Sequence, residues 1–97
     1  DRIEIGAHAT VSQRAFLCTA THDVDHPHMP LATAPIRIGA GAWVCAEAYV
    51  HPGVEIGVDA VAGVRAVVLR GVPPGQIVGG NPAKFLRMRN LEKAENA

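Results

Sequence analysis

The segment PIRIGAGAWVCAEAYVHPGVEIGVDAVAGVRAVV, residues 35–68, has a repeat of six residues that predicts the fold. An aliphatic residue returns at each sixth position, and a second apolar residue, usually small, stands two positions before it. The aliphatic positions are Ile38, Val44, Val50, Ile56, Ala62 and Val68, and their companions are Ile36, Ala42, Ala48, Val54, Ala60 and Ala66. The same spacing runs through Ile5, Val11 and Leu17. A short fixed period of this kind indicates a stacked-repeat architecture.

Each six-residue unit fits one short strand followed by a corner. Residues two positions apart on an extended backbone point to the same side, so the bulky residue and its companion both face the interior. Three units close one triangular coil, and the pattern predicts coils at residues 5–22, 38–55 and 56–73 of a parallel β-helix. Residues 23–35 interrupt the repeat with three prolines and no periodicity. We expect them to form an inserted loop, long enough to carry a function.

The C-terminal part of the chain predicts a short helix. Val72-Pro73-Pro74-Gly75 is expected to end the coils, because proline cannot donate to a strand ladder. One more short strand follows, and Asn81 then has the character of a helix N-cap with Pro82 at the first helical position. The predicted helix runs to about Lys93. Its expected buried side consists of Phe85, Leu86 and Leu91.

Length and composition describe one small domain with no net charge. We expect a β-helix over residues 1–80, with residues 23–35 inserted, and a helix and tail over residues 81–97. The chain lacks an initial Met and enters the repeat almost at once, which favours a piece of a longer protein. Cys18 and Cys45 lie in different coils and in no CxxC motif, which predicts reduced thiols and a cytoplasmic setting. No apolar run is long enough to predict a membrane span.

The charges are segregated along the chain despite the net balance. Residues 60–91 contain five basic residues and no acid, whereas residues 1–59 contain seven acids. The basic residues are Arg65, Arg70, Lys84, Arg87 and Arg89. Such a block suits a ligand that carries phosphates, although an ordinary solvated face is the alternative. The few aromatic residues are scattered, which argues against a nucleic-acid surface.

His22 is the candidate catalytic residue. It closes a coil at the mouth of the inserted loop, where a rigid scaffold can present it to a bound molecule. Imidazole titrates near neutral pH and can take a proton from a hydroxyl group, so His22 suits a general base. Trp43 directly precedes a core position and should therefore point outward, whereas His8 and His51 are expected at the surface.

Taken together, TATHDVDHP, PIRIGAGAWV, VHPGVEIGVDAVAGVRAVV and GVPPGQIVGGNPAKFL resemble the hexapeptide-repeat acetyltransferases. The run VSQRAFLCTATHD is most similar to the colanic-acid-biosynthesis type of that family. The resemblance implies an all-β fold, a left-handed parallel β-helix, and a homotrimer with active sites between subunits. It also implies transfer of acetyl from acetyl-CoA to a sugar or glycan hydroxyl without a covalent acyl-enzyme. From the histidine spacings and the scattered aromatic residues we expect no metal and no nucleic acid as partners.

The resemblance also assigns roles to individual residues. His22 matches the family's catalytic base, and Trp43 matches a tryptophan beside the acceptor and the pantetheine arm. The backbone positions that receive this arm match Ala46 and Val64. Contacts toward the nucleotide end of the cofactor match Leu69, Arg70, Lys84 and Arg87. The family often has Ala where this chain has Val64, so we expect a narrower cleft, and Leu69 replaces a residue that is usually Thr.

Two other interpretations remain open from the sequence. The chain could be a non-catalytic trimeric scaffold or a truncated remnant, because the family's upstream acceptor-binding residues have no counterpart here. A zinc enzyme of the γ-carbonic anhydrase type would need a His-x4-His pair. The spacings among His22, His26 and His28 do not supply that pair.

Overall fold

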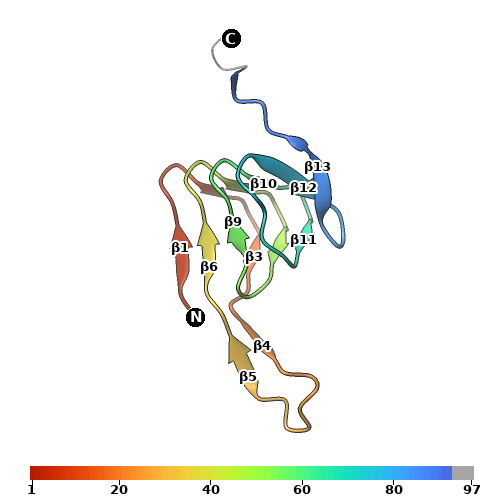
Figure 1. Ribbon diagram of the computed structural model, residues 1–97. Helices are drawn as coiled ribbons and strands as arrows, with labels where there is room; N and C mark the ends of the chain where they lie inside the picture. The colour runs from red at the N-terminus through yellow and green to blue at the C-terminus, as the bar shows by residue number, and fades with distance from the viewer. Residues whose placement is uncertain (93–97) are drawn as a thin grey trace.

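Short parallel strands stacked in three columns build the fold (Figure 1). The computed structural model describes residues 1–92. The first sheet consists of β1 (Ile3–Ile5), β6 (Ile36–Ile38) and β9 (Glu55–Ile56). The second consists of β2 (Thr10–Val11), β7 (Trp43–Val44), β10 (Val61–Ala62), β12 (Gln76–Gly79) and β13 (Lys84–Met88). The third consists of β3 (Phe16–Leu17), β8 (Tyr49–Val50) and β11 (Val67–Val68).

The register between strands confirms the predicted coil of 18 residues. Ile38 pairs with Ile56 in the first sheet, and Val50 pairs with Val68 in the third. The last coil is shorter, because Ile56 bridges to Val72 after 16 residues. Val72, which is a companion residue of the repeat, therefore takes the place of the bulky residue in this coil. The reason is that the corner at 69–71 is two residues shorter than the equivalent corner of the coil before.

The interior is a column of aliphatic side chains, as the six-residue pattern predicts. Both positions of every unit between Ile36 and Val68 are buried, with exposed fractions of 3% or less. In the first coil, the equivalent Ile5 and Val11 are 53% and 37% exposed, because only one neighbouring coil covers them. Burial of aliphatic surface on this scale is the main stabilising contribution to such a fold.

Two corners of the triangle matter for function. The corner between the second and third sheets, here the second corner, comprises residues 12–15, 45–48 and 63–66. The corner between the third and first sheets, here the third corner, comprises residues 18–19, 51–54 and 69–71. At the second corner Glu47 and Arg65 adopt left-handed backbone conformations, with φ of 60° and 57°. This geometry turns the chain sharply without glycine.

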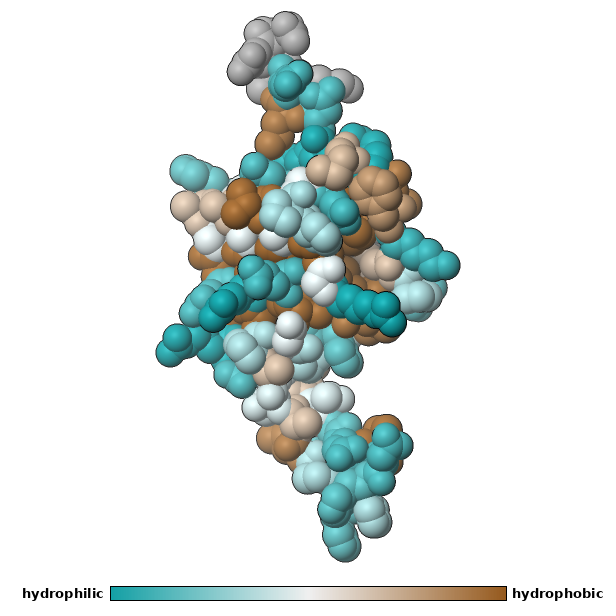
Figure 2. All heavy atoms as spheres, viewed as in Figure 1, coloured by the Kyte–Doolittle hydropathy of each residue, from teal (hydrophilic) through white to brown (hydrophobic). Residues whose placement is uncertain are grey.

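The inserted segment is more ordered than a loop. β4 (Ala20–His22) and β5 (Leu31–Thr33) form an antiparallel hairpin, with His22 opposite Leu31. The hairpin leaves the third corner and extends away from the coils (Figure 1), and its tip is mostly hydrophilic (Figure 2). The prediction that the interruption is all loop is therefore wrong at residues 31–33, where pairing with β4 supplies an order that periodicity does not reveal.

The predicted helix after Asn81 is also wrong within the described residues. The chain turns at Gly80, which has φ of 95°, and residues 84–88 return as β13, antiparallel to β12. The edge of β12 needs partners for its backbone groups, and pairing with β13 satisfies them better than a separate helix would. Leu86 closes over Gly79, where the absence of a side chain leaves it room. The predicted helix end at Lys93 and the tail at 94–97 lie outside the described residues.

The part of the chain that the structure describes contains no helix long and apolar enough to cross a bilayer.

Candidate active site at two corners of the β-helix

His22 stands at the end of β4, with its ring anchored to the other side of the hairpin. Its Nδ1 lies 2.8 Å from the carbonyl oxygen of Met29. A carbonyl oxygen only accepts hydrogen bonds, so Nδ1 must carry the proton. The neutral ring then has its lone pair on Nε2. The side chain is exposed, so this lone pair is available to a hydroxyl group.

The tip of the hairpin holds the Met29 carbonyl in place. Met29 N–H donates to the carbonyl oxygen of His26 at 2.9 Å, and Asp23 N–H donates to that of Pro30 at 3.0 Å. Met29 has φ of 42°, a left-handed conformation that a non-glycine residue adopts where its surroundings impose it. The anchor of the His22 ring is thus part of a defined turn.

Trp43 lies on the outer surface of β7, as the sequence predicts, and is 43% exposed. Its indole Nε1–H donates to Ser12 Oγ at 2.8 Å. Trp43 pairs with Thr10 of β2 and with Val61 of β10. The indole therefore lies on the second sheet, beside the second corner.

Ala46 and Val64 occupy equivalent positions of the second corner in successive coils. The hydrogen bonding of their backbone carbonyl and amide groups differs. Ala46 C=O accepts from Arg65 N–H at 3.0 Å, whereas neither the Ala46 nor the Val64 N–H has an acceptor among residues 1–92. Unpaired N–H groups at adjacent corners can bind the carbonyl groups of an extended ligand.

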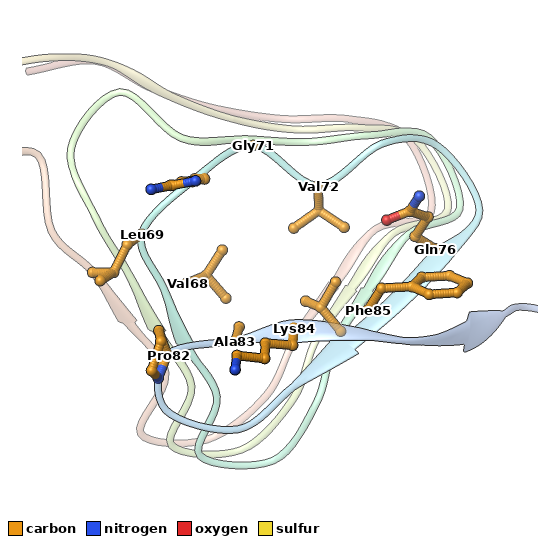
Figure 3. A pocket seen from close by; sticks show the side chains of 11 residues that line it. Val68, Leu69, Gly71, Val72, Gln76, Pro82, Ala83, Lys84 and Phe85 are labelled. Carbon is orange, nitrogen blue, oxygen red and sulfur yellow. The ribbon is translucent and has the colours of Figure 1, made fainter.

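Leu69, Arg70 and Lys84 meet at a pocket of about 470 Å³ at the C-terminal end of the coils. Figure 3 looks along the stacked coils and shows Val68 and Val72 pointing into the triangle beneath the pocket. Leu69 and Gly71 contribute the third-corner side, and Lys84 and Phe85 contribute the side made by the returning strand. The pocket thus has an aliphatic floor and two cationic side chains in its lining.

Arg87 does not line this pocket, but a bulge brings it to the same face of the hairpin as Lys84. Lys84 pairs with Gly79 and Arg87 pairs with Ile77, with a register shift between Ile77 and Val78. Directly paired residues of antiparallel strands place their side chains on one face. Without the extra residue, a spacing of three would put the two cations on opposite faces.

The structure divides the basic block into two groups. Arg65 pairs with Glu47 at 3.5 Å, and Arg89 donates to the carbonyl oxygens of Gly41 and Asp59 at 2.8 and 3.2 Å. Both therefore have structural partners. Arg70, Lys84 and Arg87 form no ion pair within residues 1–92. These are the three cations that the resemblance assigns to the cofactor.

The candidate residues do not converge within one chain. Trp43, Ala46 and Val64 lie on or beside the second corner. His22, Leu69 and Arg70 follow the third corner or its hairpin. One chain thus presents two partial sites on different corners.

Sequence reasoning missed Ser12 and Met29, and it counted Arg89 in the basic block without its structural role. A hydrogen-bond partner such as Ser12 is separated from Trp43 by 31 residues, and only the coil register brings them together.

The histidines of the hairpin are potential metal ligands. Residues 1–92, however, contain no group of three His, Cys, Asp or Glu side chains placed to hold a metal ion.

Comparison with known proteins places the chain in a family. No family model matches it. It is 40% identical over 87 residues to "Putative colanic acid biosynthesis acetyltransferase WcaF" of Escherichia coli K12, an alignment covering 90% of this chain and 48% of that protein. It is 28% identical over 91 residues to the galactoside O-acetyltransferase of the same strain, covering 91% of this chain and 45% of the relative. The chain thus spans about half the length of these relatives.

Solved structures agree with this assignment. A galactoside acetyltransferase in complex with coenzyme A superposes with a TM-score of 0.86 at 26% identity, over 96% of this chain and 48% of that one. A hexapeptide-repeat acetyltransferase of Vibrio cholerae, complexed with acetyl coenzyme A, gives 0.76 at 26% identity, over 91% and 61%. The fold is a left-handed parallel β-helix, and the chain belongs to the hexapeptide-repeat acetyltransferases.

Proposed function

We propose that this protein is an acetyltransferase that moves an acetyl group from acetyl-CoA to a hydroxyl group of a sugar or glycan. The observation that carries the proposal is the hydrogen bond from His22 Nδ1 to the Met29 carbonyl. It leaves Nε2 as a base on an exposed, anchored ring. We propose that the acceptor belongs to exopolysaccharide synthesis, because the relative with 40% identity is named for colanic acid biosynthesis.

His22 would carry out the proton transfers of the reaction. Nε2 takes the proton of the acceptor hydroxyl as its oxygen attacks the thioester carbonyl carbon. The tetrahedral intermediate then collapses with cleavage of the carbon–sulfur bond, and the imidazolium returns the proton to the leaving thiolate. Met29 holds the positive ring in the same orientation, since its carbonyl accepts from Nδ1–H in both protonation states.

The described residues fit acetyl-CoA as the donor. The unpaired N–H groups of Ala46 and Val64 suit the amide carbonyls of the pantetheine arm. The side chains of Arg70, Lys84 and Arg87, which form no ion pair within residues 1–92, suit phosphate groups. The donor is also consistent with a cytoplasmic setting, as are the free cysteines.

We place the complete site between two copies of the chain. The second corner of one copy carries Trp43, Ala46 and Val64, and the third corner of the next copy carries His22 and Arg70. Closed rings of identical subunits place unlike surfaces against each other in this way. A homotrimer, the assembly implied by the family resemblance, suits a three-cornered prism.

The test of this function is the His22→Ala variant, assayed for thiol release from acetyl-CoA with a panel of sugars and nucleotide sugars. Loss of a general base should reduce turnover by about a hundredfold to ten-thousandfold. The dissociation constant for CoA should stay within about twofold, because no donor contact is removed. His26→Ala is the matched control, since it alters the same hairpin but not the base.

Full turnover by His22→Ala would refute the assignment of the base. Failure of the wild-type protein to bind CoA at all would instead favour a non-catalytic scaffold.

A further inference from the structure

The hydrogen bond between Trp43 and Ser12 has no role in the function as described so far. We propose that Ser12 is a positioning residue that holds the Trp43 indole as a fixed wall for the acyl donor. This inference rests on the proposed function, because the donor is the ligand that the wall would face. Ser12 itself needs no contact with the donor.

Ser12 is a rigid anchor. Its backbone N–H donates to the Val44 carbonyl at 2.9 Å, and its own carbonyl accepts from Ala15 N–H at 3.3 Å. The residue is half-buried. Both of its backbone groups are therefore engaged, one across the coils and one within the corner, and they hold the Cβ that carries the hydroxyl group in place.

The bond constrains Trp43 in a particular direction. Trp43 pairs with Thr10 of the neighbouring coil. Ser12 lies in that same coil, two residues beyond Thr10 along the strand direction. Strand geometry makes that diagonal about 8 Å. The indole must therefore lie along the sheet toward the second corner and cannot stand away from it.

The corner toward which the ring leans is the one with unpaired backbone donors. Ala46 follows Trp43 after a short turn, and Val64 occupies the same position in the next coil. The coils of Ser12 and Val64 flank the coil of Trp43 on opposite sides, so the ring lies closer to the Ala46 N–H than to the Val64 N–H. A flat apolar ring beside such a donor suits a narrow ligand that carries amide groups, such as the pantetheine arm. An exposed indole without the Ser12 bond would populate several rotamers and lose this arrangement.

The protein has a single Trp, so fluorescence reports on this side chain alone. We would measure acrylamide quenching and emission of Trp43, and CoA binding by calorimetry, in the wild type and in Ser12→Ala and Ser12→Thr. Thr33→Ala, which removes an exposed hydroxyl group from β5, is the matched control. Circular dichroism confirms that each variant is folded.

For Ser12→Ala we expect a rise in the quenching constant, a red-shifted emission and about a threefold to tenfold weaker affinity for CoA, the range that one hydrogen bond supports. Ser12→Thr should restore all three values, and Thr33→Ala should change none. A folded Ser12→Ala protein with wild-type quenching would overturn the inference. So would altered quenching with unchanged affinity.

If wild-type protein fails to bind CoA, the proposed function fails, and with it the donor-facing role of Ser12. The quenching data would still decide separately whether Ser12 orients the ring.

Discussion

At the scale of single residues, the structure distinguishes side chains that the sequence presents as equivalent. Five basic residues form one block in the sequence. Arg65 and Arg89 are bound to Glu47 and to backbone carbonyls. Arg70 and Lys84 have no such partners among the described residues, and Arg87 reaches only the adjacent Met88 carbonyl. Only these three are candidates for phosphate contacts.

This division predicts the salt dependence of donor binding. The double variant Arg70→Ala with Lys84→Ala should weaken CoA binding by about tenfold at low salt, since exposed ion pairs contribute up to about 1 kcal/mol each. The difference should shrink as salt screens the charges. Calorimetry at two salt concentrations measures it. The control, Arg2→Ala with Arg37→Ala, makes the same change in charge on the first sheet, and an equal loss there would contradict a localised phosphate site.

The two cysteines should differ in reactivity. Burial raises the pKa of the Cys45 thiol, so less thiolate forms at pH 8, and the 4% exposed side chain is also shielded from reagents. A disulfide reagent should therefore modify Cys18, which is half-buried, before Cys45. The Cys45→Ala variant should lack only the slow phase. Equal rates for both thiols in the folded wild type would show that the coil opens more readily than its packing implies.

At the scale of elements, β13 is the segment whose conformation context decides. Its sequence has helix-compatible residues and a good N-cap, yet it pairs with β12. The free edge of β12 and the turn at Gly80 outweigh local preference. Arg89 then attaches the end of the strand to the corner of the coils.

Arg89→Ala should loosen β13. Its guanidinium group binds the Gly41 and Asp59 carbonyls, and loss of about 1.5 kcal/mol would make amide exchange in β13 about tenfold faster. Hydrogen exchange followed by mass spectrometry measures this. Arg87→Ala is the matched control, because its side chain reaches only the adjacent Met88 carbonyl. Similar exchange in both variants would mean that strand pairing alone holds β13.

At the scale of the whole molecule, the candidate site residues are distributed over two corners of the β-helix. A triangular prism cannot turn both corners toward the same ligand. Neighbouring copies can, because the second corner of one copy then faces the third corner of the next.

Mixed oligomers of His22→Ala and Trp43→Ala should therefore recover activity that neither variant has alone. With random mixing of equal amounts, about a quarter of the sites combine an intact His22 with an intact Trp43 from different copies. Copies carrying different tags would be co-expressed and the mixed species purified before assay. Mixed oligomers with no more activity than the separate variants would place both residues in the site of a single copy.

The coils and the candidate base, His22, can be predicted from the sequence alone. A six-residue period can only be satisfied by stacking, because each unit buries its apolar side against the next, so residues 36–68 behave as predicted. His22 and Trp43 are candidates because they match residues of the hexapeptide-repeat acetyltransferases, which the motifs of this chain resemble in their order. The sequence also determined which segment of the chain is cationic.

The conformations of the inserted hairpin and of the C-terminal strand, in contrast, are seen in the folded molecule and are not predicted by the sequence pattern. β13 pairs with β12, whose free edge exists only after the coils have stacked, whereas β4 and β5 pair with each other in a separate two-stranded sheet. The tertiary structure likewise decided the tautomer of His22, through Met29, and the orientation of Trp43, through Ser12. The Trp43–Ser12 contact joins residues that lie close together only once the coil register is in place, and the His22–Met29 contact depends on the pairing and the turn of the hairpin. Spacing along the chain therefore carries no record of them.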